Sequence, residues 1–427
     1  MGAVVLIVSA CGSSGSSSSG GGSAQSTATP NTQNITGLEG DNANGAITNY
    51  LTYVGGKSGK ADSSLSPVYI GWVNQQGGST ASTPEATQGA QAAVNFVNNS
   101  LGGIGGHPLA LRSCFVTSAE EEGQKCGQQL AADSSVSAIA FGSVAVGNQS
   151  FERVVAGKKP LVIGVSGNPA DTSAQNTYIL YGDQVHILEP FGTYLNQKLH
   201  AKTAAMIYPN EAGLSSGAAA TKKGLEKAGV KVKSVGYDPN ATDMLGALTA
   251  AGAQSADVVF PFPDTPQCAA IAKSLTQIGN RKPVVSQPLC LDPKVAAALG
   301  DLPKWTYGIA SVLPSDKSAP DAVTYTAVAG RNGLGAGTVN PWAEVAWGTI
   351  LGMAKFMNAT GADKLSAETM SAQLKAFKGP LILGAPNINC GQFSDAPAVC
   401  NNQIRLYTYE GKGAFKPAAG WTKPPSG

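Results

Sequence analysis

The fold of this chain follows from the stretch Val68-Tyr69-Ile70-Gly71-Trp72-Val73 and, after a short polar loop, Ser82-Thr83-Pro84-Glu85. The apolar first run is typical of a buried strand. The second motif predicts a helix start, because a hydroxyl residue can cap a helix and proline fits its first turn. Apolar residues continue at helical spacing from Ala86 to Val97. A buried strand followed by such a helix is the repeating unit of a parallel α/β sheet.

The alternation continues along the chain. We expect further strands at 109–111, 137–141, 160–165, 203–208, 230–237, 257–262, 283–286 and 305–312. Helical patterns, such as 214–228 and 267–278, lie between most of them. Repeated units of this kind predict mainly parallel sheets flanked by helices, one before residue 183 and one after it. Helical segments at 319–331, 341–358 and 366–377 then break the alternation, and a strand pair at 404–409 and 414–416 closes the chain.

The N-terminus predicts export. An apolar run from Ala3 to Val8 is followed by Ser9-Ala10-Cys11 and a Gly/Ser-rich tract. This arrangement resembles a bacterial lipobox, in which the cysteine becomes the lipidated N-terminus, so residues 1–11 are interpreted as a lipoprotein signal. The run is shorter than the roughly 20 residues needed to span a bilayer. The alternative is an ordinary cysteine in a tail. One feature counts against the signal, because no Lys or Arg precedes Glu39 and the usual basic region is therefore missing.

Residues 12–66 are interpreted as a flexible Gly/Ser-rich linker and an N-terminal extension. The linker proper is 12–34. Residues 35–66 are polar and rich in glycine, and no firm structure is predicted for them. The globular part is expected to start at Pro67.

Composition limits the class of protein. The 427 residues favour two or three lobes. A net charge of +2, with no strong block of basic residues, argues against a nucleic-acid partner.

Seven cysteines leave an even six once Cys11 is set aside. In an exported protein an even number predicts disulfides. We expect the local pairs Cys114/Cys126, Cys268/Cys290 and Cys390/Cys400, since each would link neighbouring elements; free buried thiols are the alternative. Without a Cys-x-x-Cys motif and with only three histidines, neither a metal site nor a cofactor is predicted.

Taken together, the chain resembles the type I periplasmic binding proteins, specifically the branched-chain amino-acid-like solute-binding proteins of ABC importers. The resemblance lies in the first strand, the helix ending Val94–Asn98, the turn Gly102–Pro108, the Cys114/Cys126 couple and Asn340–Trp347. It implies two α/β lobes with doubly wound parallel sheets, joined by three hinge crossings. Lobe 1 would be 67–184 plus 313–385, and lobe 2 would be 185–312 plus 386–427.

In that family the ligand binds between the lobes and hinge closure buries it. Ligands of open parallel sheets also sit beyond the carboxyl ends of the strands, where helix N-termini offer free amides. The residues just past the strands, which offer amides, hydroxyls and loop N–H groups, are therefore the expected ligand-binding set: Gln75, Gln76, Ser143, Val144, Ser166, Gly167, Asn168, Asn210, Asp264 and Gln287, with Tyr181 and Asp183 at the hinge. The competing reading is that amides such as Gln75 and Asn168 bond their own turns, and that Tyr181 belongs to the core.

The chain departs from the amino-acid-binding pattern at three places. The family's Thr after the fifth strand is missing from Val165–Asn168, its Tyr-Gly is replaced by Glu211-Ala212-Gly213, and no acidic residue stands at Gln287–Leu289. The expected solute is therefore an amino acid, an amide or a small organic acid.

An enzyme is disfavoured because no Gly-x-Ser-x-Gly elbow, P-loop or dinucleotide fingerprint occurs. A ligand-sensing lipoprotein of the same fold, acting with a receptor partner, is the alternative function. The expectation is an extracytoplasmic, lipid-anchored, non-catalytic monomer that delivers its solute to ABC permease subunits.

Overall fold

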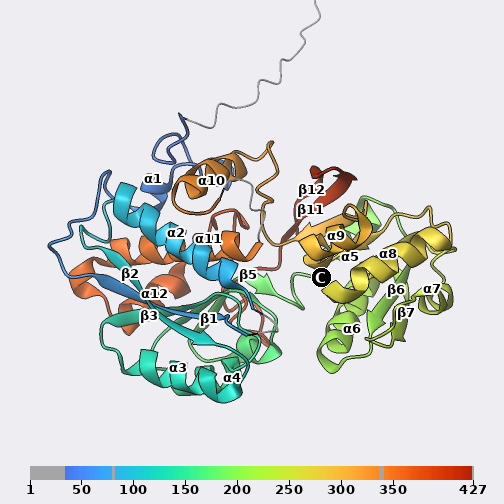
Figure 1. Ribbon diagram of the computed structural model, residues 1–427, viewed down its shortest axis with the longest axis horizontal. Coiled ribbons are helices and arrows are strands. Elements are labelled where there is room, and N and C mark those ends of the chain that lie inside the picture. The colour runs from blue at the N-terminus through green and yellow to red at the C-terminus, as the bar shows by residue number, and fades with distance from the viewer. Residues whose placement is uncertain (1–33, 79–81, 336–340, 426–427) are drawn as a thin grey trace, which may run out of the picture.

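The computed structural model describes residues 34–78, 82–335 and 341–425, which form two α/β lobes lying side by side (Figure 1). The opening stretch of sequence forms β1 (Val68–Gln75) and α2 (Pro84–Ser100), as predicted. The other strands of lobe 1 are β2 (Leu109–Val116), β3 (Val136–Phe141), β4 (Leu161–Ser166) and β5 (Thr177–Asp183). They form a parallel sheet in the order β2-β1-β3-β4-β5. β5 was not among the predicted strands, although its β-branched and aromatic residues are typical of a strand.

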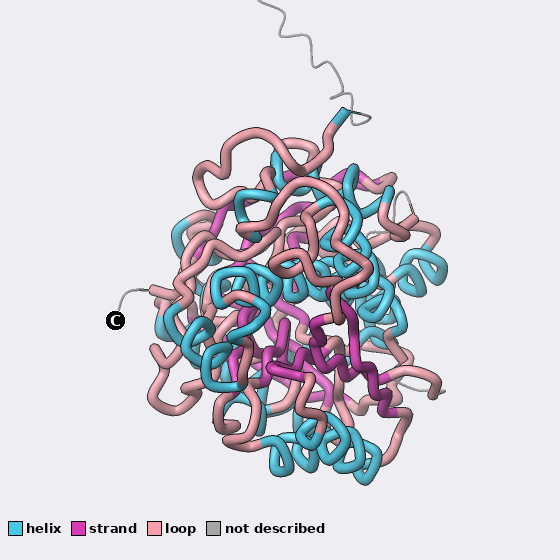
Figure 2. Tube along the Cα trace, turned by 90° about the vertical axis from the view of Figure 1, so that its left-hand side faces the viewer, coloured by secondary structure: helices cyan, strands magenta, loops and turns pink. Residues whose placement is uncertain are grey.

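Helices cover both faces of this sheet, as Figure 2 shows with lobe 1 toward the viewer. On one face are α2, α10 (Pro320–Arg331), α11 (Pro341–Thr360) and α12 (Ala367–Ala376), which share a core with Ile70, Trp72 and Val162. On the other face are α3 (Glu120–Ala132) and α4 (Asn148–Val155), whose core includes Val73 and Ile139. Successive residues of β1 thus serve opposite cores, as the period of two in a strand requires.

Lobe 2 repeats the plan. One sheet has the order β7-β6-β8, with β6 (Thr203–Pro209), β7 (Lys231–Tyr237) and β8 (Val258–Pro261) all parallel. A second sheet has the order β12-β11-β10-β9, with β9 (Val285–Ser286), β10 (Thr306–Ile309), β11 (Ile404–Gly411) and β12 (Ala414–Thr422). A bridge between Val259 and Val284 links the two sheets, and β11 runs antiparallel to both of its neighbours.

The helices of lobe 2 also divide between the two faces. On one side, α5 (Pro190–Gln197) and α6 (Ala212–Lys227) contribute Phe191 and Leu225 to a core with Met206. On the other, α7 (Leu245–Ala251), α8 (Cys268–Gln277) and α9 (Pro293–Leu299) pack over Ile207. The described chain passes between the lobes after β5, after β10 and before β11. The predicted α/β class with two doubly wound lobes is confirmed.

The N-terminal segment 34–66, for which no firm structure was predicted, is folded against lobe 1, so the globular part begins before the expected Pro67. It contains the short helix α1 (Tyr50–Val54), and Ile47, Tyr50, Tyr53 and Val54 are buried in the same core as α2 and α11. The Tyr53 hydroxyl donates to the Pro380 carbonyl at 3.2 Å. The apolar residues from Ile47 to Val54 explain this, because they cover helix surface that would otherwise face water.

Residues 386–403 pack on lobe 1, whereas the predicted division placed them in lobe 2. The Ile179 amide on β5 donates to the Ala398 carbonyl at 2.8 Å, and the Cys400 amide donates to the Ile179 carbonyl at 3.0 Å. Val399 is buried in the core beneath α3 and α4. The chain therefore covers the outer edge of β5, whose backbone groups need partners, before it enters lobe 2 at β11.

All three predicted disulfides are present, Cys114–Cys126, Cys268–Cys290 and Cys390–Cys400. No helix in the described ranges is both long and apolar enough to cross a membrane. Cys11, the predicted lipidation site, lies outside the described residues.

Candidate functional site

The carboxyl end of β1 organises the lobe 1 edge through Asn74, a residue that the sequence analysis did not select. Its Oδ1 accepts from the Ser143 amide at 2.8 Å, and its Nδ2 donates to the Thr83 carbonyl at 2.8 Å. Asn74 is completely buried and joins the loop after β3 to the start of α2. The sequence signal for Asn74 was its position as the first polar residue after the apolar run 68–73.

Gln75 and Gln76 both take part in this framework. The Gln75 Oε1 accepts from the amides of Ala145 and Val146 at 2.9 and 3.3 Å, so the side chain holds the loop after β3 from inside. The Gln76 Oε1 accepts from the Thr87 hydroxyl at 2.7 Å. Within the described residues no hydrogen bond uses the Gln76 Nε2. Gln75 is therefore a supporting residue, while Gln76 keeps a free donor.

The loop after β3 carries Ser143 and Val144. Both are half-buried, and Val144 packs against the core under α3 and α4. The Ser143 backbone is held on both sides, because its amide donates to Asn74 and its carbonyl accepts from the Gln75 amide at 2.9 Å. Its hydroxyl makes no hydrogen bond within the described part of the chain, so it is available to a ligand.

Ser166 and Asn168, after β4, belong to a buried polar cluster with residues of α4 and η2 (Pro169–Ser173). The Ser166 hydroxyl donates to Asp171 Oδ2 at 2.7 Å, and the Asn168 Nδ2 donates to Asn148 Oδ1 at 3.0 Å. Burial raises the pKa of Asp171, and burial together with the nearby Asp171 raises the pKa of Glu152 well above its usual range. The side chains of Ser166, Asn168, Asn148 and Asp171 are bonded to one another, which leaves the exposed backbone of Gly167 as the accessible part of the loop.

The two hinge residues have structural partners. Tyr181 lies in the lobe 1 core, and its hydroxyl donates to the Ile382 carbonyl at 2.7 Å. Asp183 accepts from the amide and the Nδ1 of His186 at 3.1 and 2.8 Å. Burial disfavours the charged imidazole, but the Asp183 hydrogen bond and the charges of Asp183, Glu189 and Asp395 together outweigh burial and raise the pKa of His186. Both residues fix the chain where it leaves lobe 1.

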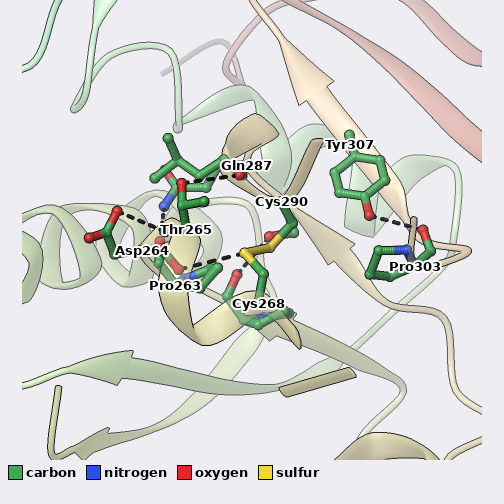
Figure 3. The surroundings of a disulfide bond; sticks show 11 residues. Pro263, Asp264, Thr265, Cys268, Gln287, Cys290, Pro303 and Tyr307 are labelled. Carbon is green, nitrogen blue, oxygen red and sulfur yellow. Dashed lines mark hydrogen bonds between the residues drawn. A yellow bond between two sulfur atoms is a disulfide. The ribbon is translucent and has the colours of Figure 1, made fainter. Parts of the chain in front are cut away.

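On lobe 2 the loops after β8 and β9 are tied together, as Figure 3 shows. The buried Gln287 donates from Nε2 to the Pro263 carbonyl at 2.9 Å, and the Thr265 hydroxyl donates to the Leu289 carbonyl at 3.3 Å. The Cys268–Cys290 disulfide joins the same two segments covalently. This bracing gives the loops a fixed geometry, which lowers the entropy cost of ligand binding.

Asp264 and Asn210 are the predicted residues of lobe 2 that retain exposed polar groups. Asp264 Oδ1 accepts from the Thr265 amide at 2.8 Å and caps η3 (Thr265–Gln267), which leaves Oδ2 without a partner among the described residues. Asn210 is exposed at the end of β6, and its backbone N–H donates to the Tyr237 carbonyl at 2.8 Å.

Tyr237, which ends β7, is a further residue that the sequence analysis missed. Its hydroxyl is buried and has no hydrogen-bond partner in the described structure. Burial raises its pKa, and the charges of Asp264 and Glu211 raise it further, so those carboxylates lie nearby. An unsatisfied buried hydroxyl beside a strand-end carboxylate marks a polar site. The sequence signal that could have found Tyr237 was its place at the end of the predicted strand 230–237.

A comparison with family models decides the classification. A periplasmic binding protein model matches residues 67–396. The chain belongs to the periplasmic binding protein family. The predicted resemblance is confirmed, and so is the family's type I fold.

Solved structures of this family share the fold. A leucine-binding protein from Thermotoga maritima has a TM-score of 0.65 at 16% identity, covering 84% of this chain and 99% of that one. A fatty acid ABC transporter substrate-binding protein from Thermomonospora curvata has a TM-score of 0.65 at 16% identity, covering 87% and 96%. An ABC transporter solute-binding protein from Rhodopseudomonas palustris HaA2, in complex with p-hydroxybenzoic acid, has a TM-score of 0.63 at 16% identity, covering 84% and 96%. A search of curated proteins found no match.

Proposed function

We propose that this protein is an extracytoplasmic, non-catalytic solute-binding protein that captures a small polar molecule between its lobes and delivers it to an ABC importer. The observation that carries the proposal is the match to the periplasmic binding family over residues 67–396. The loops at the strand ends support it, because both lobes present braced segments with unused polar groups. Ligands of open parallel sheets bind at such strand ends.

In this proposal each lobe contributes its own contacts. Lobe 1 offers the Ser143 hydroxyl, the Gln76 Nε2 and the backbone of Gly167. Lobe 2 offers the Asp264 carboxylate and the Tyr237 hydroxyl. Asn74, Gln75 and Gln287 hold the loops in place and do not touch the ligand. Rotation of the lobes about the hinge would bring the two halves onto one solute and exclude water.

The proposed solute class remains an amino acid, an amide or a small organic acid. The sequence has no acidic residue at Gln287–Leu289, but Asp264 lies on the loop that Thr265 ties to Leu289. Its free oxygen would pair with an ammonium or an amide N–H, as a charge-assisted hydrogen bond. Hydroxyl and backbone N–H groups on lobe 1 would then hold a carboxylate or carbonyl.

The proposal includes a lipid anchor at Cys11 and permease subunits as partners. Metabolic labelling with a radioactive fatty acid should label the wild type and not Cys11→Ser. Equal labelling of the two proteins would contradict the anchor, without bearing on solute binding.

A ligand screen tests the solute proposal. The full chain carrying Cys11→Ser is stripped of ligand by unfolding and refolding, then heated with amino acids, amides and organic acids. A ligand at 100 times its Kd stabilises the folded state by about 2.7 kcal/mol, which raises the melting temperature by several degrees. Small-angle scattering with the best ligand should show compaction. No hit in any class, or a hit without compaction, would contradict the proposal.

Variants then assign the contacts. Hydrogen bonds that involve charged groups contribute about 1.5–3 kcal/mol, so Asp264→Asn should weaken an ammonium or amide ligand by roughly 10- to 150-fold. Ser143→Ala should weaken it by roughly 2- to 10-fold. Asp363→Asn, an exposed aspartate on η5 (Ala362–Lys364), is the matched control and should leave the affinity unchanged. An unchanged affinity in Asp264→Asn would remove that residue from the site.

A further inference from the structure

A groove lies between α10 of lobe 1 and the β11–β12 hairpin of lobe 2, elements that stand beside each other in Figure 1. Its volume is about 780 Å³, within the range of small-molecule pockets. Residues 314–335 form one wall and 410–417 the other, and none of the predicted ligand-binding residues lines it. The groove is therefore separate from the loops at the carboxyl ends of the strands.

The walls of the groove are mostly apolar. Val323, Ala329 and Leu334 line the lobe 1 side, and Phe415 and Pro417 line the hairpin side. The Phe415 ring packs against Tyr409 with 4.8 Å between ring centroids, which holds it in place. A surface of this kind favours binding of the apolar part of a ligand. The free energy gained is about 25 cal/mol for each Å² of apolar surface that is removed from water.

The charges at the groove are predominantly positive. Lys317 stands on the lobe 1 side and Lys412 and Lys416 on the hairpin, all three exposed and without an ion-pair partner among the described residues. Asp316 does not neutralise them, because it is buried and paired with Arg405 at 3.3 Å. Glu410 is the other acidic residue of the lining. An anionic group would complement this excess of lysines.

We propose that this groove is a second ligand site, which takes a small organic anion with an apolar body, such as a medium-chain carboxylate. The apolar part would lie between α10 and the hairpin, and the anionic group would meet lysines from both sides. Because the two walls belong to different lobes, such a ligand bridges the lobes away from the solute site. The proposal goes beyond solute capture and delivery. The volume of the groove fits a small molecule.

Sodium octanoate is the probe, titrated calorimetrically into the full chain carrying Cys11→Ser. We expect saturable binding that weakens with added salt, as screening of exposed charges requires. Octanamide, which has the same apolar body without the charge, should bind at least about tenfold more weakly. Lys412→Glu/Lys416→Glu should weaken octanoate about tenfold or more, because like charges repel across a binding surface. Lys317→Glu should weaken it too, from the opposite wall.

The control pair is Lys273→Glu/Lys294→Glu, two exposed lysines of lobe 2 outside the groove, which should leave octanoate binding unchanged. Equal melting temperatures of the variants would show that they fold. The proposal is overturned if wild type shows no saturable binding, if octanamide binds as tightly, or if the groove variants bind octanoate as well as the control pair. The last outcome is also the one expected if octanoate enters the solute site instead. An effect of the hairpin pair without any effect of Lys317→Glu would overturn the bridging of the lobes.

Discussion

Replacing Tyr50 with alanine tests whether the N-terminal segment is part of the lobe 1 core. The Tyr50 side chain is fully buried, and its ring lies edge-on to Phe96 and Trp347, with centroids 5.7 and 6.0 Å away. Truncating a buried large aromatic residue costs about 3–5 kcal/mol, because the transfer energy is lost and a cavity remains. Each aromatic pair adds about 0.5–1.5 kcal/mol.

We expect a loss of about 3 kcal/mol, at the lower end of that range, because α1 is a helix of only five residues and can move to fill part of the cavity. This is roughly a 150-fold change in the unfolding equilibrium. Urea unfolding followed by tryptophan fluorescence measures it, since Trp347 lies against Tyr50 and reports on lobe 1.

Thr52→Ala is the control on the same helix, because Thr52 is exposed. It should change the free energy of unfolding by no more than about 0.5 kcal/mol, as most surface substitutions do. If Tyr50→Ala is equally mild, the segment 34–66 does not contribute to the core, and the packing argument fails.

Three further predictions concern stability. Cys268→Ser/Cys290→Ser should cost about 3.4 kcal/mol, from the entropy of closing a loop with a sequence separation of 22; urea unfolding measures the loss, and a change below about 1 kcal/mol would contradict it. Gln75→Ala should cost about 1–3 kcal/mol, because two part-buried hydrogen bonds from backbone amides are lost, at about 0.5–1.5 kcal/mol each; a neutral result in the same assay would mean that water replaces the side chain. Glu344 is buried on α11, neither carboxylate oxygen has a partner in the described structure, and burial raises its pKa well above the usual 4.5. The folded protein thus keeps a proton that the unfolded chain releases, so the Glu344 contribution to stability falls as pH rises above 4.5. Glu344→Gln removes this dependence, and its stability relative to wild type should increase between pH 5 and pH 8; a constant difference would show that the carboxyl is not protonated in the folded state.

The candidate site was predictable as a region but not as a set of free side chains. The selected loops do follow strands in both lobes, because strand direction places them at one edge of each sheet. That they bind a ligand stays a prediction. Gln75, Ser166 and Gln287 were selected with them, yet each is already bonded within the protein. Tyr237 was missed, although its buried hydroxyl has no partner among the described residues.

The sequence by itself determined the α/β class, the run of strands and helices and the three local disulfides. These depend on short-range patterns, namely apolar periodicity, capping residues and cysteines close along the chain. Only the tertiary structure decided that residues 34–66 cover lobe 1, that residues 386–403 protect the edge of β5, and which polar side chains remain free. The partners in these contacts are distant in sequence, as in Asn74 with Ser143 and Tyr53 with Pro380. A hydrogen-bonding group is satisfied or left free by the loop that folding brings to it, and a local pattern carries no information about that loop.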